Sequence, residues 1–298
     1  MRGLAGADWQ KVAQPKHNDK RQANVPSVDI ERVATLMREV ADQVIMPRWR
    51  NLAAHEIGHK ARPNDIVTIA DREAEALLTR HLGDLLPGSH VIGEEAVSAD
   101  PRLLQLFRSP EPVWVIDPID GTRKFTEGQP IFDVMVALVQ NGKGVAGWIY
   151  APAENDFYMG EAGSGVVRRQ GKAAAIPVRP PPRTALPDFM GIVTSQGFLN
   201  RKLQDPEVVR SRFRGFTRHT CAGHNYARLL KGECDFLINL ATLPWDHLPG
   251  LTLAAEAGFH QARLDGAGYD PLDQQGGILV APNGASWRDI RAELFPGS

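Results

Sequence analysis

Acidic residues that can bind a metal ion follow several apolar segments of this sequence of 298 residues. The apolar run Val113 to Ile116 ends in Asp117-Pro118-Ile119-Asp120-Gly121-Thr122. Two carboxylates at this spacing can hold a hard cation through oxygen, and the Gly-Thr turn after them can point backbone N–H groups at an anion. Such a segment alone is more often an ordinary acidic turn, so it predicts a metal and phosphate site only together with other acids.

Further acids occupy comparable places elsewhere in the chain. Glu94 and Glu95 follow the short apolar run that ends at Gly93, and Trp245-Asp246 precedes a segment with helical periodicity. Each of these acids, taken separately, has a plain explanation as a surface loop or a helix cap. They indicate a functional site only if folding brings them together with Asp117 and Asp120.

The order of the motifs resembles the inositol monophosphatase family of Mg²⁺-dependent phosphatases. Four motifs carry the resemblance, namely Val67-Thr68-Ile69-Ala70-Asp71, Gly93-Glu94-Glu95, Asp117 to Thr122, and Trp245-Asp246. The similarity extends over about residues 30–294. It implies a layered α/β (α+β) fold, an α-β-α-β-α sandwich of the inositol monophosphatase and fructose-1,6-bisphosphatase type. It also implies a homodimer.

The resemblance assigns roles to individual residues. It implies two or three Mg²⁺ ions per active site, held by Glu94, Asp117, the carbonyl of Ile119, Asp120 and Asp246. The implied catalytic residues are Asp71, Thr122 and Glu94, with Thr122 and Asp71 orienting the water that attacks phosphorus. The implied substrate-binding residues are Gly121, Thr122, Cys221, Ala222, Asn239 and Asp246. Lys60 is expected to support a third, weaker metal or the loop near it.

Departures from the family pattern leave the substrate open. Asn239 stands where inositol-selecting members carry an acid, and Arg123 and Lys124 add positive charge after the Asp-Gly-Thr segment, where they can contact a second anionic group. The implied function is hydrolysis of a small phosphorylated metabolite. Inositol 1-phosphate, histidinol phosphate, a sugar bisphosphate and 3′-phosphoadenosine 5′-phosphate remain alternative substrates, and a phosphate-binding relative without activity is a further possibility.

Other motifs compete with this interpretation. His55-Glu56-Ile57-Gly58-His59 matches the H-E-x-x-H pattern of zinc proteases, which needs both histidines on one helical face. Pro63 leaves such a helix little room, so we expect a polar loop. Residues 142–147 read G-x-G-x-x-G but continue as a strand, which predicts a hairpin turn. The zinc-ligand types at His219, Cys221, His224 and Cys234 lack the spacing of a structural zinc site, so we expect pocket or core positions.

Hydrophobic periodicity predicts the elements that position these residues. Helices are expected at 30–45, 68–85, 206–213, 222–231, 248–257 and 287–294, and strands at 90–93, 113–116, 131–139, 145–150, 157–159, 165–168, 189–194, 236–240 and 277–281. Five prolines between Ile176 and Pro187 predict a linker. We therefore expect a polar tail at 1–26, an N-terminal domain at 27–175 with most metal ligands, and a C-terminal domain at 176–298.

Composition narrows the possible partners and the cellular compartment. The 34 basic and 35 acidic residues give a formal net charge of -1, so no overall field favours nucleic acid or an anionic membrane. Two cysteines cannot form a disulfide framework, which favours a reducing, cytoplasmic compartment. No apolar run approaches the ~20 residues that span a bilayer. We expect neither a nucleic-acid nor a membrane partner.

Overall fold

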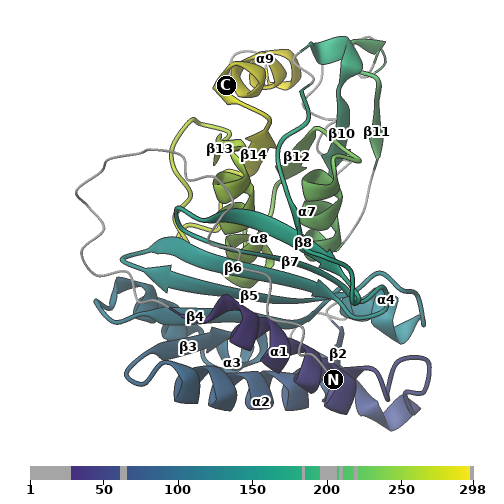
Figure 1. The fold of residues 1–298 in the computed structure, drawn as a ribbon, viewed down its shortest axis with the longest axis vertical. Helices are drawn as coiled ribbons and strands as arrows, with labels where there is room; N and C mark the ends of the chain where they lie inside the picture. Colours follow the sequence, from purple (N-terminus) through teal and green to yellow (C-terminus); the bar gives the residue numbers. More distant parts are fainter. Residues whose placement is uncertain are drawn as a thin grey trace, which may run out of the picture.

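The structure, a computed structural model, describes residues 28–60, 66–182, 185–194, 207, 211–217 and 221–295. Layers of helices and sheets alternate along its long axis (Figure 1). From the bottom of that view they are α1 (Ile30–Val40) with α2 (Ile69–Leu85), a seven-stranded sheet, α7 (Ala222–Lys231) with α8 (Pro244–Ala257), a five-stranded sheet, and α9 (Gly284–Leu294). The predicted α-β-α-β-α sandwich is confirmed.

The seven-stranded sheet carries the acidic segment. Its strands lie in the order β3 (His90–Gly93), β4 (Val113–Asp120), β5 (Asp133–Gln140), β6 (Lys143–Ala151), β7 (Asp156–Glu161), β8 (Gly165–Gln170) and β9 (Ile176–Pro177). Only the β3–β4 pair is parallel among these strands. Asn141 and Gly142 join β5 to β6 with φ angles of 52° and 72°, as the primed two-residue turns require. The G-x-G-x-x-G segment is therefore a hairpin turn, as predicted.

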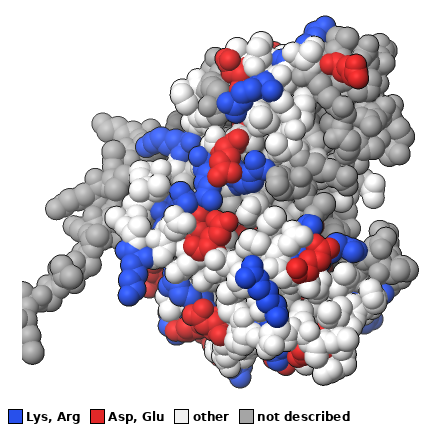
Figure 2. Space-filling view, turned by 90° about the vertical axis from the view of Figure 1, so that its right-hand side faces the viewer, with Lys and Arg blue, Asp and Glu red and all other residues white. Residues whose placement is uncertain are grey.

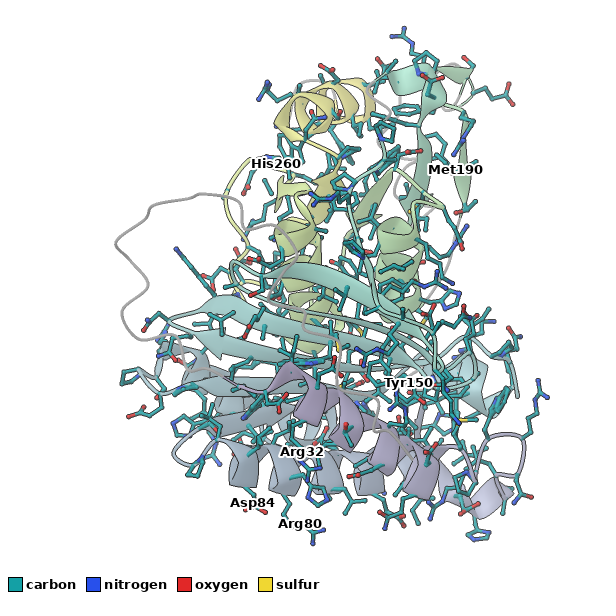
Figure 3. All side chains as sticks on the ribbon, in the orientation of Figure 1. Arg32, Arg80, Asp84, Tyr150, Met190 and His260 are labelled. Carbon is teal, nitrogen blue, oxygen red and sulfur yellow. The ribbon has the colours of Figure 1, made fainter. Side chains whose placement is uncertain are left out.

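Helices α1 and α2 cover one face of this sheet. Asp29 caps α1 by accepting hydrogen bonds from the N–H groups of Glu31 and Arg32, and α1 continues into a π-helical segment, Ala41–Ile45. The buried stripe of α2 packs with alternate side chains of β4 and β5, and consists of Ala70, Ala74, Leu78 and Leu82. Arg80 and Asp84 lie on its outer face (Figure 3). Amphipathic periodicity thus predicts which side of α2 meets the sheet.

The five-stranded sheet forms the upper layer. Its order is β11 (Gly215–Thr217), β10 (Met190–Val193), β12 (Phe236–Asn239), β14 (Ile278–Ala281) and β13 (His260–Arg263). Met190 and His260 mark two of these strands in Figure 3. Helix α9 covers the outer face, where Trp287 and Ile290 pack against Phe236 and Leu279. The edge strands β11 and β13 were not predicted, because each is short and neither has a fully buried alternating face.

The central core lies between the two sheets. Met135 and Ile149 of the lower sheet share one cluster with Leu237 and Val280 of the upper sheet and with side chains of α7 and α8. This cluster contains residues from both sides of the predicted boundary at 175/176. The division into two domains therefore stays a prediction.

Several predicted boundaries differ from the structure. Helix α8 begins at Pro244, four residues before its predicted start, because Pro244 occupies the first turn, where its missing N–H costs nothing, and Pro249 is tolerated inside. The expected linker opens with β9, which pairs with β8, and contains a 3-10 turn, Leu186–Asp188. The polar tail at 1–26 and half of the helix expected at 206–213 lie outside the described residues. No helix in the described part of the chain is long and apolar enough to cross a membrane.

Candidate active site

Strand β4 delivers the first two acids of the site. It pairs in parallel with β3, with Gly93 opposite Ile116, so both strands end at the same edge of the sheet. This pairing brings Glu94, the first residue of α3 (Glu94–Ala99), beside Asp117. The register with β5 shifts between Asp117 and Asp120, so the chain bulges where the two carboxylates emerge. The N–H of Ile119 donates to Asp117 Oδ1 across this bulge at 3.1 Å.

Asp246 joins the other acids from the far half of the chain. It lies in the first turn of α8. The sequence had suggested a position before the helix. Burial raises the pKa of Asp246 well above its usual value, and the charges of Asp120 and Glu94 raise it further. Burial likewise raises the pKa of Asp117, with added contributions from Glu94, Asp120 and Asp246. Such mutual effects show that these four carboxylates lie near one another, and their role as metal ligands stays a prediction.

This set of side chains fits a hard divalent cation. Asp117 and Asp120 are 1% and 7% exposed, and buried carboxylates are costly unless they are paired, protonated or bound to a metal. The donors are carboxylate oxygens with the carbonyl of Ile119 adjacent, which are the ligands that Mg²⁺ accepts. The Ile119 carbonyl oxygen lies 2.9 Å from the Thr122 hydroxyl, whose single proton can be donated to this oxygen or to Asp71. The donor chemistry therefore matches the implied metal.

Thr122 and Asp71 form a hydrogen-bonded pair beside the acids. The hydroxyl of Thr122 lies 3.1 Å from Asp71 Oδ1, while Asp71 Oδ2 accepts hydrogen bonds from the N–H and the hydroxyl of Thr68. Asp71 thus caps α2 and also reaches Thr122. Burial raises the pKa of Asp71 to about 7, although the hydrogen bonds from Thr68 oppose this shift. The pair combines a hydroxyl with a carboxylate that can accept a proton near neutral pH.

Gly121 is constrained by its surroundings. Its φ of 88° lies in the left-handed region, and a Cβ there would approach the Ile131 carbonyl to 2.8 Å and Cys221 Sγ to 3.1 Å. The residue precedes the short helix α4 (Thr122–Thr126), so the N–H groups of Gly121 and Thr122 lie at the helix start. Glycine is therefore required where β4 turns into α4.

Asp120 also contacts the start of α7. The N–H of Gly223 and the thiol of Cys221 donate to its Oδ2, the thiol at 3.0 Å. Cys221 is fully buried, and Ala222 begins α7 next to it. Asn239, at the end of β12, is only 2% exposed. Contact of Cys221, Ala222 and Asn239 with substrate stays a prediction.

Glu75 supports the acidic site and was not predicted from the sequence. Its carboxylate accepts hydrogen bonds from the N–H groups of Glu95 and Ala96, both at 2.8 Å, and so caps the helix that carries Glu94. A Cβ on Gly93 would lie 2.2 Å from Glu75 Cδ, so glycine is needed there. Burial raises the pKa of Glu75 to about 7. The i, i+4 spacing from Asp71, on the same face of α2, was the available signal.

Lys60 faces the same acids from the opposite side. Its ammonium lies 2.6 Å from both Glu94 and Glu95. Burial alone lowers the pKa of Lys60, but the two carboxylates more than offset this effect and raise it. Lys60 is therefore a fixed positive charge beside Glu94 and Glu95. Its expected support of a third metal stays a prediction.

Arg123 and Lys124 lie on α4, beside Thr122. Lys124 pairs with Glu127 at 3.1 Å, and Arg123 is exposed. Basic and acidic side chains are interspersed over the described part of the face drawn in Figure 2. Arg123 and Lys124 thus add positive charge next to Thr122.

The H-E-x-x-H segment does not have the geometry of a zinc protease. Residues Ala54–Glu56 form one 3-10 turn, and β1 (Ile57–His59) pairs with β2 (Ile66–Thr68) as a short hairpin. His55 and His59 are therefore not one turn apart on a helix, because an extended strand separates them. The segment is a turn and an edge strand, where the sequence had suggested a loop.

Comparisons with known proteins agree with this site. A sequence profile of the inositol monophosphatase family matches residues 28–294. The chain is 27% identical over 224 residues to inositol-1-monophosphatase of Bacillus subtilis, covering 75% of this chain and 82% of that protein. It is 30% identical over 238 residues to Nus factor SuhB of Vibrio cholerae, covering 78% and 82%. The solved structure of a Thermotoga maritima IMPase superposes with a TM-score of 0.73 at 25% identity, covering 89% and 95%.

The fold and the acidic site define a phosphoric monoester hydrolase with a metal-dependent type of active site. The chain belongs to the inositol monophosphatase family. The motifs between Val67 and Asp246 that resemble this family in the sequence also contribute to the acidic site of the fold.

Proposed function

We propose that this protein hydrolyses a small phosphorylated metabolite with the help of two or three Mg²⁺ ions per active site. The single observation that carries the proposal is the convergence of Glu94, Asp117, Asp120 and Asp246 from three separate elements. A surface turn or a helix cap does not explain four acids in one place, of which Asp117 and Asp120 are buried and the other two half-buried.

The metal ligands are assigned as follows. Glu94, Asp117 and the carbonyl of Ile119 would hold one ion, and Asp117, Asp120 and Asp246 would hold a second. Bound Mg²⁺ supplies positive charge that activates water and stabilises the negative charge of phosphoryl transfer. Lys60 holds Glu94 in place through its ion pair.

Thr122 and Asp71 accept the proton of the attacking water. Thr122 Oγ1 accepts a hydrogen bond from the attacking water and donates its own proton to Asp71 Oδ1, which already lies 3.1 Å away. A base works best when its pKa lies near the working pH, and the pKa of Asp71 is raised to about 7. The N–H groups of Gly121 and Thr122 would bind the phosphate at the start of α4.

The substrate class follows from the neighbouring residues. The name of the Bacillus subtilis relative, inositol-1-monophosphatase, favours inositol 1-phosphate. Asn239 supplies an amide where inositol-selecting members carry an acid that contacts hydroxyl groups. Arg123 and Lys124 favour a substrate with a second anionic group. Histidinol phosphate, a sugar bisphosphate and 3′-phosphoadenosine 5′-phosphate are therefore the alternatives to be compared.

We infer a cytoplasmic homodimer whose ligand is a metabolite. The charge balance of 34 basic and 35 acidic residues supplies no overall field for nucleic acid, so the Nus-factor name of the Vibrio cholerae relative is not carried over.

The test is phosphate release from a panel of inositol, histidinol, sugar and adenosine phosphates, with Mg²⁺ and with EDTA. We expect release that depends on Mg²⁺ and prefers one substrate. His59→Ala should retain this activity, because the H-E-x-x-H segment is not a helix. Binding of phosphate esters without turnover at saturating Mg²⁺ would instead indicate a binding protein. Loss of bound zinc together with all activity in His59→Ala would restore the protease hypothesis.

A further inference from the structure

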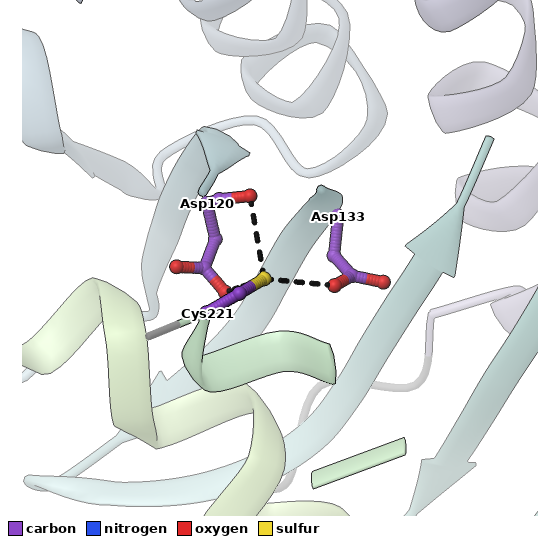
Figure 4. A group of neighbouring side chains, drawn as sticks. All are labelled: Asp120, Asp133 and Cys221. Carbon is purple, nitrogen blue, oxygen red and sulfur yellow. Dashed lines mark hydrogen bonds between the residues drawn. The ribbon is translucent and has the colours of Figure 1, made fainter. Parts of the chain in front are cut away.

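A thiol and two carboxylates meet on the side of Asp120 that faces α7. Cys221 Sγ lies 3.0 Å from Asp120 Oδ2 and 3.2 Å from Asp133 Oδ2 (Figure 4). Asp133 stands opposite Asp120 in the β4–β5 register, and Cys221 precedes α7. All three side chains are buried, and their ligand atoms lie within 4.8 Å of one another.

The thiol of Cys221 faces more acceptors than it has protons. The thiol carries one hydrogen, yet it faces Asp120 Oδ2, Asp133 Oδ2 and, at 3.6 Å, the Asp120 carbonyl oxygen. Asp133 is 0% exposed, and its Oδ1 has no hydrogen-bond partner in the described part of the chain. A fully buried carboxylate directed at a thiol, with one oxygen unsatisfied, calls for a cation.

We propose that Asp120, Asp133 and Cys221 form a binding site for a borderline-soft divalent cation, with Zn²⁺ as the physiological candidate. The donor chemistry decides between cations, because thiolate selects Zn²⁺ whereas Mg²⁺ is bound by oxygen. In a tetrahedral zinc site the sulfur and oxygen ligands lie roughly 3.5 Å apart, so the observed separations need only a small expansion. His224 Nδ1 lies 3.9 Å from Asp133 Oδ2 and supplies a fourth donor of a type that zinc accepts.

The site is distinct from the Mg²⁺ site but adjoins it. The second carboxylate oxygen of Asp120 points away from the thiol (Figure 4). On binding Zn²⁺ the thiol becomes a thiolate and its proton leaves to solvent, with no transfer of electrons. Because Asp120 is also assigned to the Mg²⁺ site, Zn²⁺ bound here would lower phosphate release. That consequence rests on the proposed function, whereas binding itself does not.

The experiment uses Co²⁺ as a spectroscopic probe on the EDTA-stripped, dialysed full chain. A Co²⁺–thiolate bond gives a charge-transfer absorption in the near ultraviolet that carboxylates alone do not give. We expect this band to saturate at one equivalent and to be displaced by Zn²⁺. Cys221→Ser should abolish the band. Cys234→Ser is the matched control, because Cys234 is the other cysteine of the sequence and is also buried.

Asp133→Asn tests the second ligand without removing the sulfur. We expect it to keep the band but to raise the Co²⁺ dissociation constant by ~10-fold or more. Absence of the band in the unmodified chain would overturn the proposal, as would full intensity in Cys221→Ser, loss in Cys234→Ser or an unchanged dissociation constant in Asp133→Asn. If Cys221→Ser does not fold, the other two variants still decide. Phosphate release is not needed for any of these readouts.

Discussion

Thr122 Oγ1 and Asp71 Oδ1 lie 3.1 Å apart although 51 residues separate them in the chain. Asp71 is fixed by the capping box at the start of α2, and Thr122 is fixed by the turn that ends β4. Because local structure holds both residues, no further side chain is needed to fix the contact between them. Asp71, which caps α2, is therefore also positioned to accept a proton.

Removal of the Thr122 hydroxyl should separate chemistry from binding. Thr122→Val should lower kcat by ~10²-fold or more with little change in KM, because the water loses its proton acceptor. Thr122→Ser is the matched control, since it keeps the hydroxyl and should stay within a few-fold of the original rate. Steady-state kinetics with the preferred substrate check this. Equal losses in both variants would contradict the assigned role.

Asp117→Asn should abolish turnover and also stabilise the metal-free protein. The substitution removes one of several neighbouring buried charges, so the free energy of unfolding in EDTA at pH 7 should rise by ~1–3 kcal/mol. Added Mg²⁺ should raise the melting temperature of the original protein but not that of the variant. Unchanged kinetics, or an unchanged response to Mg²⁺, would remove Asp117 from the metal site.

The stability of the metal-free protein should fall as pH rises from about 4 to about 7. The pKa of Asp71 is 3.8 when exposed and about 7 in the fold, so in this interval the folded state binds more protons than the unfolded state. The full shift corresponds to about 4 kcal/mol as an upper limit. Glu75 acts in the same direction.

Asp71→Asn isolates the contribution of Asp71 to this pH dependence. Urea unfolding in EDTA at pH 5 and pH 8 should show a smaller loss of stability in the variant than in the original protein. The same slope in both proteins would mean that Asp71 is ionised throughout.

Gly93 and Glu75 should be energetically coupled. Gly93→Ala forces a Cβ against the Glu75 carboxylate and should cost ~1–3 kcal/mol of stability. Glu75→Ala should itself cost ~1–3 kcal/mol, because the N–H groups of Glu95 and Ala96 lose their acceptor. The double variant should be less destabilised than the sum. Strict additivity in denaturant unfolding would show that the contact is not maintained.

Sequence signals of short range predicted much of the fold. Thr68 and Asp71 mark the start of α2, and the apolar run before Asp117 predicts β4, because capping and alternation depend on residues only a few positions apart. The start of α8 at Pro244 was missed because Pro249 lies inside the helix. The strands β11 and β13 were missed because pairing at a sheet edge leaves little pattern in a short segment.

Contacts between distant segments could not be predicted from the spacing of residues in the sequence. The zinc-ligand types at His219, Cys221, His224 and Cys234 lacked a regular zinc spacing, and His219 lies outside the described residues. Asp133 was not considered, because as a polar residue in an apolar strand it has no local signal. Only the register of β4 with β5 places it opposite Asp120 and near Cys221.

The sequence by itself therefore determined the longer helices, most strands and the four acidic motifs, because these depend on local propensity and on residue types. The short helices α3 and α4 were not predicted. Tertiary structure alone decided which acids share one site, which oxygen of Asp120 faces the thiol, and that Glu75 supports α3. The physical reason is that strand register and helix docking are set by burial of apolar surface over the whole core, which no single segment encodes.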